Sequence, residues 1–69
     1  MIYDAVLKVA PGDVPLVGHV LWGQIHNDRK LRFSDGHLVH TSKIRAVNAN
    51  SDGVFISTMN SIYKVEEIV

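Results

Sequence analysis

The sequence contains no cysteine among its 69 residues. This absence excludes disulfide bonds, thiolate metal sites and cysteine nucleophiles, so a zinc site would have to use histidine and carboxylate ligands alone. A chain this short buries only about 60% of the surface that its unfolded form exposes, which leaves a lone core marginal. We therefore expect a homo-oligomer rather than a stapled monomer.

An excess of charge of either sign is also missing, because seven Lys and Arg residues balance seven Asp and Glu residues. Sequence-independent nucleic-acid binding depends on surplus basic residues that neutralise phosphates. A local basic patch is the remaining candidate, formed by Arg29, Lys30, Arg32, Lys43 and Arg45. Solvated strand faces are the ordinary interpretation of such charges, and a nucleic-acid or nucleotide-binding barrel is the alternative.

Long apolar runs are absent too, since none approaches the roughly 20 residues that a membrane-spanning helix needs. The first residues, MIYDAVLKVAPG, carry an acid at Asp4 and lack the basic leader and long apolar stretch of a signal peptide. We therefore expect a cytoplasmic protein that does not contact a membrane.

The stretch KLRFSDGHLVHTSKI, residues 30–44, is centred on Asp35-Gly36. A type I′ turn at this dipeptide predicts a hairpin, because both of its central positions need positive φ. Side chains alternate along each strand, so one face of the predicted hairpin turns toward the core. That face holds Leu31, Phe33, Leu38 and His40.

A second hairpin is predicted around Asp52-Gly53, with Asn50 opposite Phe55. Its core-facing side chains are then Val47, Ala49, Val54 and Ile56. Phe55 is the one aromatic residue that this register places on the outer face. An outward Phe on an otherwise polar strand indicates a subunit interface, because it needs cover.

The two hairpin regions share a sequence echo. Ser-Asp-Gly followed by HLVHT begins at residue 34, and Ser-Asp-Gly followed by VFIST begins 17 positions later, at residue 51. Two similar hairpins stacked in one barrel explain this echo, and chance is the alternative because Ser-Asp-Gly is common turn chemistry.

The remaining segments extend the β pattern. Residues 2–9 fit either a strand or a short helix, and we favour a strand that ends at Pro11-Gly12. Residues 14–22 are almost continuously apolar, which predicts a strand buried on both sides, with Gly18 at a bulge or barrel corner. A turn at Met59-Asn60 leads into a last strand over 62–68.

No stretch after residue 12 has a helical stripe of apolar residues. Five to six short strands with turn signals at near-regular spacing predict an all-β fold. We expect a small rolled meander or an SH3-like or OB-like barrel that forms a single domain over residues 1–69. Closure would remove the sheet edges that such a small β-protein otherwise exposes.

Histidine and serine residues invite metal and hydrolase hypotheses, and neither is supported by spacing. The four histidines are His19, His26, His37 and His40. His37 and His40 point to opposite faces of a strand, and neither H-x-x-x-H nor H-E-x-x-H occurs. The sequence also lacks a G-x-S-x-G elbow and a glycine-rich phosphate loop. We therefore predict no metal, no cofactor and no enzymatic activity.

Polar residues gather at the predicted ends of the two hairpins. They are Thr41, Ser42, Thr58, Asn60 and Ser61, with Lys43, Arg45 and Tyr63 nearby. Hydroxyls, an amide, basic groups and a phenol can together bind a small anion or nucleotide. The same side chains also cap loose backbone groups at strand corners, which is the structural alternative.

The chain resembles short uncharacterised proteins of bacterial prophages and related mobile elements. The residues that carry the resemblance are Arg32-Phe33, Asp35-Gly36, Leu38-Val39, Thr41-Ser42, Asn60-Ser61 and Tyr63-Lys64. It implies a cytoplasmic accessory protein of phage or plasmid origin and assigns no catalytic residue. We therefore predict a small non-enzymatic interaction module that contacts other proteins, including a host protein, with nucleic-acid binding as the alternative.

Overall fold

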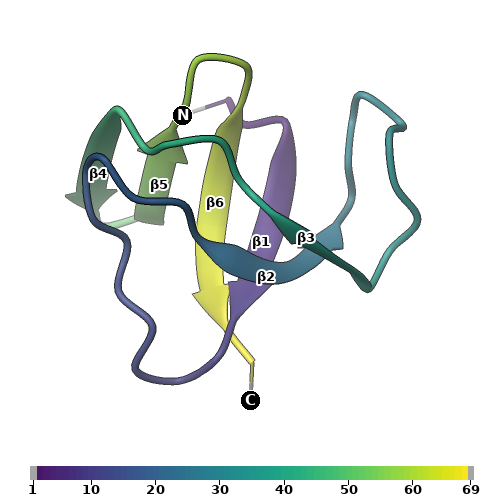
Figure 1. The fold of residues 1–69 in the computed structure, drawn as a ribbon, viewed down its shortest axis with the longest axis horizontal. Coiled ribbons are helices and arrows are strands. Elements are labelled where there is room, and N and C mark those ends of the chain that lie inside the picture. Colours follow the sequence, from purple (N-terminus) through teal and green to yellow (C-terminus); the bar gives the residue numbers. More distant parts are fainter. Residues whose placement is uncertain (1, 69) are drawn as a thin grey trace.

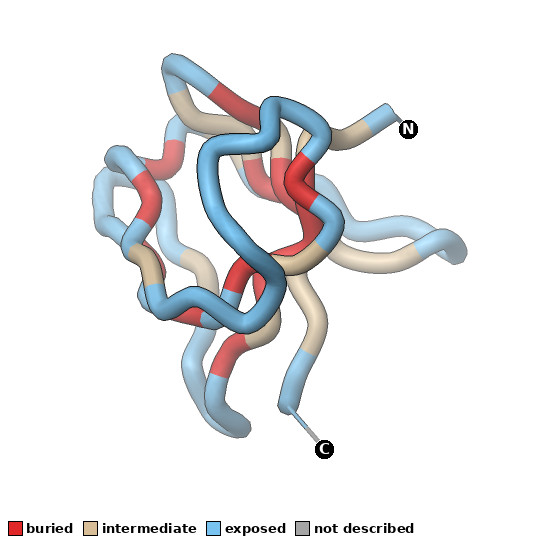
Figure 2. The backbone as a smooth tube through the Cα atoms, turned by 90° about the vertical axis from the view of Figure 1, so that its right-hand side faces the viewer, coloured by how far each residue is buried: buried red, intermediate tan, exposed pale blue. Residues whose placement is uncertain are grey.

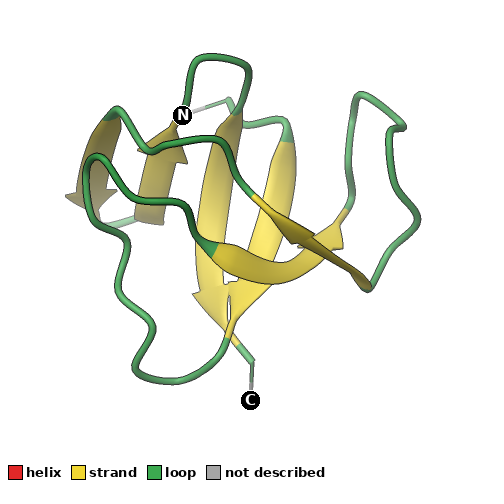
Figure 3. Ribbon diagram, viewed as in Figure 1, coloured by secondary structure: helices red, strands yellow, loops and turns green. Residues whose placement is uncertain are grey.

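The computed structural model describes residues 2–68, which form six strands and no helix (Figures 1 and 3). The strands are β1 (Ala5–Val9), β2 (Trp22–His26), β3 (His37–His40), β4 (Ala46–Asn50), β5 (Gly53–Ser57) and β6 (Ile62–Glu67). The predicted all-β class is therefore confirmed. Within the same residues, no helix has the length and apolar character that a bilayer crossing needs.

All six strands belong to one mixed sheet in the order β3-β2-β1-β6-β5-β4. β1 and β6 are its central pair and run parallel, whereas the other neighbours are antiparallel. The sheet is rolled, since the chain measures 26 × 25 × 24 Å whereas a flat sheet is thin in one direction. The sheet is not closed, because β3 and β4 are its edge strands, whereas we predicted either a rolled meander or an SH3-like or OB-like barrel.

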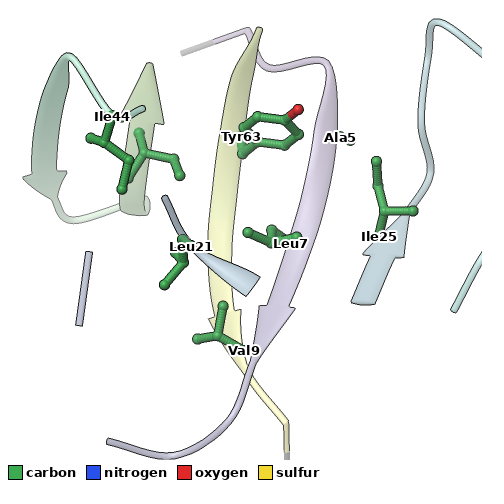
Figure 4. Packing of buried hydrophobic residues seen from close by; sticks show 8 residues of the cluster. Ala5, Leu7, Val9, Leu21, Ile25, Ile44 and Tyr63 are labelled. Atoms are coloured by element: carbon green, nitrogen blue, oxygen red, sulfur yellow. The ribbon is translucent and has the colours of Figure 1, made fainter. Parts of the chain in front are cut away.

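The core lies inside the roll, against the central pair of strands. Figure 4 shows side chains from β1, β2, β6 and the segments next to β2 and β4 meeting there. The cluster consists of Ala5, Leu7, Val9, Leu21, Ile25, Ile44, Ile56 and Tyr63. Figure 2 shows that buried positions concentrate in this interior, while most positions of the long connections are exposed. The strands predicted in residues 2–9 and 62–68 thus exist and supply the centre of the fold.

The predicted turn at Asp35-Gly36 forms, since the His37 N–H donates to the Ser34 C=O at 3.1 Å, but the hairpin predicted between residues 30 and 44 does not. β3 pairs with β2 instead, and residues 27–36 form a long loop between them. The Asp28 carboxylate accepts the backbone N–H groups of Lys30 and Arg32, which curls the segment that was expected to be a strand. Leu31 consequently has φ of +54°, a left-handed conformation that a strand does not contain.

The predicted inner face of that hairpin is therefore wrong as well. Its four members, Leu31, Phe33, Leu38 and His40, are all exposed. Leu38 and His40 share a face with the Trp22 side of β2, which points away from the core. Asp35 contributes its side chain to the loop, since its Oδ1 accepts the Asn27 N–H at 2.8 Å.

The second predicted hairpin forms as β4 and β5, with a corrected register. Asn50 pairs with Gly53 and Asn48 with Phe55, so the two-residue turn is Ser51-Asp52. The correction moves each pairing by two residues and therefore leaves the two faces unchanged. Ile56 is buried as predicted, whereas Val47 and Ala49 near the β4 edge are exposed.

Phe55 is the main correction on this hairpin. It was predicted to be exposed, and it is only 2% exposed. Its ring lies 5.8 Å from that of Tyr3, in a tilted arrangement typical of aromatic pairs. The N-terminal segment thus covers the outer side of β5, and the suggested interface at Phe55 loses its basis.

Residues 14–20 form an exposed connection and not the predicted buried strand. The chain turns between Leu16 and His19, and Gly18 adopts φ of +88° at this turn. Two backbone hydrogen bonds, each 2.8 Å long, hold the segment to Ile44. The Gly18 N–H donates to the Ile44 C=O, and the Ile44 N–H donates to the His19 C=O. Only Leu21, at its end, enters the core.

The sequence echo does not mark equivalent hairpins. In the first occurrence of the echo, residues 37–40 form the edge strand β3. In the second occurrence, residues 53–57 form the interior strand β5. The predicted Met59-Asn60 turn is confirmed, since the Thr58 N–H donates to the Ser61 C=O at 2.9 Å.

Candidate functional site

The predicted polar site is built around the buried carboxylate of Asp28, whose side chain is 1% exposed. Arg32 donates to it from Nε and from Nη2, each at 3.1 Å, in the bidentate geometry that suits a guanidinium and a carboxylate. The backbone N–H groups of Lys30 and Arg32 complete its partners. Asp28 thus holds the 27–36 loop together.

The electrostatics of this pair keep both groups ionised. Burial alone would raise the pKa of Asp28, but hydrogen bonds from the Arg32 side chain and from two backbone N–H groups outweigh it and lower that pKa. The pKa of Arg32 is raised, mainly by its hydrogen bond to Asp28 and further by Tyr63. Burial alone would lower this pKa, but its effect is the smaller one. Arg32 is therefore committed to an internal partner.

Lys30 and Arg32 also tie this loop to the 58–61 turn. Arg32 Nη1 and Lys30 Nζ both donate to the Ser61 hydroxyl, at 3.0 and 3.1 Å, and Lys30 Nζ also donates to the Asn60 carbonyl. Lys30 Nζ lies 4.0 Å from Asp4 Oδ2, which itself accepts the Ile62 N–H. The arrangement fastens the loop to both central strands.

The structure thus brings together many of the residues predicted to bind a ligand, in structural roles. Asn60 Nδ2 donates to the Ser42 hydroxyl at 3.3 Å. Thr41 is 1% exposed, and its hydroxyl accepts the Leu21 N–H, while the Tyr63 ring belongs to the core. Burial removes both from the surface that a ligand contacts. The basic residues Arg29, Lys43 and Arg45 are exposed.

Leu31 gives a direct test of how this loop is built. Replacing Leu31 with Asn should stabilise the protein by about 1 kcal/mol, because Asn tolerates positive φ better than Leu. Leu31 is 89% exposed, so little packing is lost. Urea unfolding measures the gain, and Leu31→Ala is the matched control, since Ala keeps the strain. An equal gain in both variants would contradict the explanation.

A second surface, which the sequence did not reveal, centres on Trp22. Three shallow depressions meet at this residue, and around them lie exposed apolar and aromatic side chains. We call it the Trp22 surface, and it comprises Val14, Leu16, Val20, Trp22, Phe33, His37, Leu38, His40 and Ile68. It covers the outer face of β2 and β3 and extends over the 14–20 connection.

The rings on the Trp22 surface are paired. Trp22 and His40 lie 4.8 Å apart between ring centroids, and Phe33 stacks on His37 at 5.4 Å. Arg32 lies 5.9 Å from the Phe33 ring centroid, which links this surface to the polar loop. These pairs hold the aromatic side chains in place without covering them.

Two features hid this surface from the sequence pattern. The apolar run over 14–22 is typical of a buried strand, and the Asp35-Gly36 turn predicts that Phe33 and Leu38 face inward. Pro15 and Gly18 inside the run were the signal against a central strand, because Pro lacks an N–H and Gly has no side chain to pack.

The histidines are not assembled into a metal centre. Within residues 2–68, no group of three or more His, Asp or Glu residues is placed to hold a metal ion. His37 and His40 each contact an aromatic ring on the Trp22 surface instead.

Comparisons of the chain with protein-family models, with curated proteins and with solved structures find no match. The resemblance to prophage proteins therefore stays a prediction.

Proposed function

We propose that this protein is a small non-enzymatic interaction module that binds protein chains through the Trp22 surface. The observation that carries this proposal is the exposure of its large apolar residues, with Trp22 54%, Leu38 63% and Phe33 42% exposed. Contiguous exposed apolar patches of this kind are rare on monomers and are typical of interaction sites. Tryptophan is also prominent among the residues that dominate binding energy at protein interfaces.

The predicted biological setting belongs to the same proposal. A phage or mobile-element origin and a cytoplasmic location follow from the resemblance, and a host protein is one partner class that it implies. Apolar contacts of the Trp22 surface would serve such a partner without requiring net charge, of which the chain has none.

Nucleic-acid binding is the second candidate, favoured by the paired rings on the same surface. Bases of a single strand stack on aromatic side chains, and a basic groove then follows the phosphates. Lys30 and Arg32 are engaged in internal bonds, which weakens this candidate. Arg29, Lys43 and Arg45 are the basic residues of the predicted patch that remain for phosphates.

A peptide-library selection tests the proposal, with the single tryptophan as an internal fluorescent probe. We expect selected peptides to shift Trp22 emission to shorter wavelength, and Trp22→Ala to weaken them by roughly 30-fold or more, the loss typical of an interface hot spot. Met59→Ala is the matched control, because Met59 is apolar and 76% exposed but lies outside the Trp22 surface.

Salt dependence separates the two candidates. Phosphate-driven binding falls by roughly 10³ to 10⁵ between about 50 and 200 mM salt when six to ten phosphates are contacted. We expect peptide binding to change little over this range and a mixed-sequence single-stranded oligonucleotide not to bind. Failure to enrich any peptide, together with salt-sensitive oligonucleotide binding, would overturn the proposal in favour of the second candidate.

A further inference from the structure

The edge strand β3 is short, at 4 residues, which is one way of protecting a sheet edge, but its sequence has none of the residues that protect one. Its sequence is His-Leu-Val-His, without Lys, Pro or a carboxylate, and it is the last strand of the sheet. Natural proteins commonly block such edges with charge, proline or a bulge, because an open edge pairs with another strand. The open edge of β3 is therefore free to form hydrogen bonds with another strand.

The backbone groups available for pairing follow from the contact with β2. Thr41 N–H donates to the C=O of Leu21, the residue before β2, at 3.0 Å, and Leu21 N–H donates to the Thr41 hydroxyl, so Thr41 points its N–H toward the β2 side. Hydrogen-bonded pairs recur at every second residue of an antiparallel ladder, so Val39 also points its backbone groups toward β2. Leu38 and His40 then direct their N–H and C=O groups away from the sheet.

We infer that β3 pairs antiparallel with β3 of a second copy of this chain, and that the Trp22 surfaces of both copies become continuous across the junction. This inference rests on the proposed function, since it takes the Trp22 surface as an interaction surface and joins the Trp22 surfaces of two copies into one. The interface is isologous, meaning that the same strand contributes from both sides of a two-fold axis.

The free backbone groups narrow the choice of register for this pairing. A register that brings Gly36 opposite His40 of the second copy is excluded, because Gly36 N–H already donates to Ile25 C=O at 2.7 Å. When Leu38 lies opposite His40 of the second copy, the outward N–H and C=O groups of both residues are paired. The two-fold axis repeats this pair, so His40 also lies opposite Leu38 of the second copy. Val39 then meets Val39 of the second copy on the two-fold axis.

The side chains suit this register. Leu38 and His40 share the face of Trp22, so Leu38 of one copy lies beside the Trp22–His40 ring pair of the other. Val39 already packs against the core from the opposite face, and its symmetric contact extends that core across the axis. No carboxylate or lysine lies on β3, so like charges do not oppose one another.

A second copy fits better than an oppositely charged partner for two reasons. The formal net charge is zero, so two copies do not repel one another over long range. A stable interface of standard size covers about 800 Å² on each partner, which is less than one fifth of the 4501 Å² surface of this chain.

Sedimentation equilibrium tests the stoichiometry. We expect a mass of twice 7.7 kDa at high micromolar concentration. Leu38→Pro should reduce the mass to 7.7 kDa, because proline removes an outward N–H that only the second copy uses. Leu38→Ala, which keeps that N–H, is the matched control and should remain largely dimeric. Circular dichroism of Leu38→Pro confirms that the monomer is still folded.

Disulfide cross-linking tests the register, and the absence of native cysteine makes each introduced thiol unique. Val39→Cys should cross-link to its symmetric copy under mild oxidation, since a non-hydrogen-bonded pair brings Cα atoms to about 4.5 Å, within the range of a disulfide. Leu38→Cys should not, because it lies diagonally from its own copy, at about 7–8 Å. Val47→Cys tests whether two copies pair through β4, the other edge strand of the sheet, and should not cross-link.

The outcomes distinguish this inference from the proposed function. A monomeric mass, or cross-linking of Val47→Cys or Leu38→Cys in place of Val39→Cys, would overturn pairing through β3 in this register. Library peptides that still bind the Trp22 surface would leave the proposed function standing in that case. If the protein dimerises through β3 but binds no library peptide, the inference is supported and the proposed binding of other protein chains is wrong.

Discussion

Replacing Asp28 with Ala is expected to lower the free energy of unfolding by about 2 to 3 kcal/mol, because it breaks an ion pair and frees two backbone N–H groups. The expected loss is smaller than for a fully buried pair, since the Arg32 side chain is 30% exposed and is partly solvated. For a domain of this size the melting temperature should fall by roughly 10 to 20 °C. Thermal and urea unfolding measure the loss.

Asp28→Asn separates charge from hydrogen bonding. Asn keeps one carbonyl oxygen for a backbone N–H but no longer neutralises Arg32, so we expect a loss of about 1 to 2 kcal/mol. Asp52→Asn is the control, because Asp52 lies in the exposed β4–β5 turn and should change stability by less than about 0.5 kcal/mol. Equal losses at positions 28 and 52 would contradict the structural role of Asp28.

The pH dependence has a defined sign. The pKa of Asp28 is lowered from 3.8, so its contribution is fully present above the unfolded-state value and is lost as pH falls through the lower folded-state value. The difference in unfolding free energy between the native protein and Asp28→Asn should therefore narrow below pH 3.8. A difference that widens there would show that Asp28 is not stabilised as a carboxylate.

Gly23→Ala is expected to destabilise the protein by roughly 3 kcal/mol, at the upper end of the range for an overpacked core. A Cβ atom at this position would lie 2.6 Å from the Lys8 carbonyl oxygen and 2.9 Å from Leu7 Cγ. The first contact is with the backbone of β1, a central strand, which cannot move without disturbing the sheet. Chemical unfolding measures the loss.

The control for this substitution is Gln24→Ala on the same strand. Gln24 is exposed, so removing its side chain should change stability by no more than about 0.5 kcal/mol. A Gly23→Ala protein as stable as Gln24→Ala would show that β1 and β2 do not approach as closely as described.

Local turn and strand patterns predicted much of the fold. The Ser51-Asp52-Gly53 region gave the position of the β4–β5 hairpin, because Asp and Gly accept the backbone angles of a tight turn. The strand character of residues 2–9 and 62–68 was equally visible, since branched and aromatic residues favour an extended chain. These are properties of neighbouring residues and do not depend on the rest of the molecule.

The failures share one cause, which is competition from distant or side-chain partners. The turn at Asp35-Gly36 forms, since the His37 N–H donates to the Ser34 C=O at 3.1 Å, but bonds to the Asp28 carboxylate curl the residues before it, so no strand leads into the turn. Phe55 was predicted outward from a correct alternation of faces, but Tyr3 covers that face too. No pattern within the hairpin could show that the N-terminal segment lies there.

By itself, the sequence determined that this protein is all-β, lacks disulfides, has no net charge and contains a hairpin at residues 46–57. Each of these depends on composition or on residues close together along the chain. Only the tertiary structure decided that β3 pairs with β2, that Gly23 is the point of close approach and that Trp22 lies on an exposed apolar surface. Those features arise from contacts between residues far apart in the chain, where burial and buried hydrogen bonds outweigh local preference.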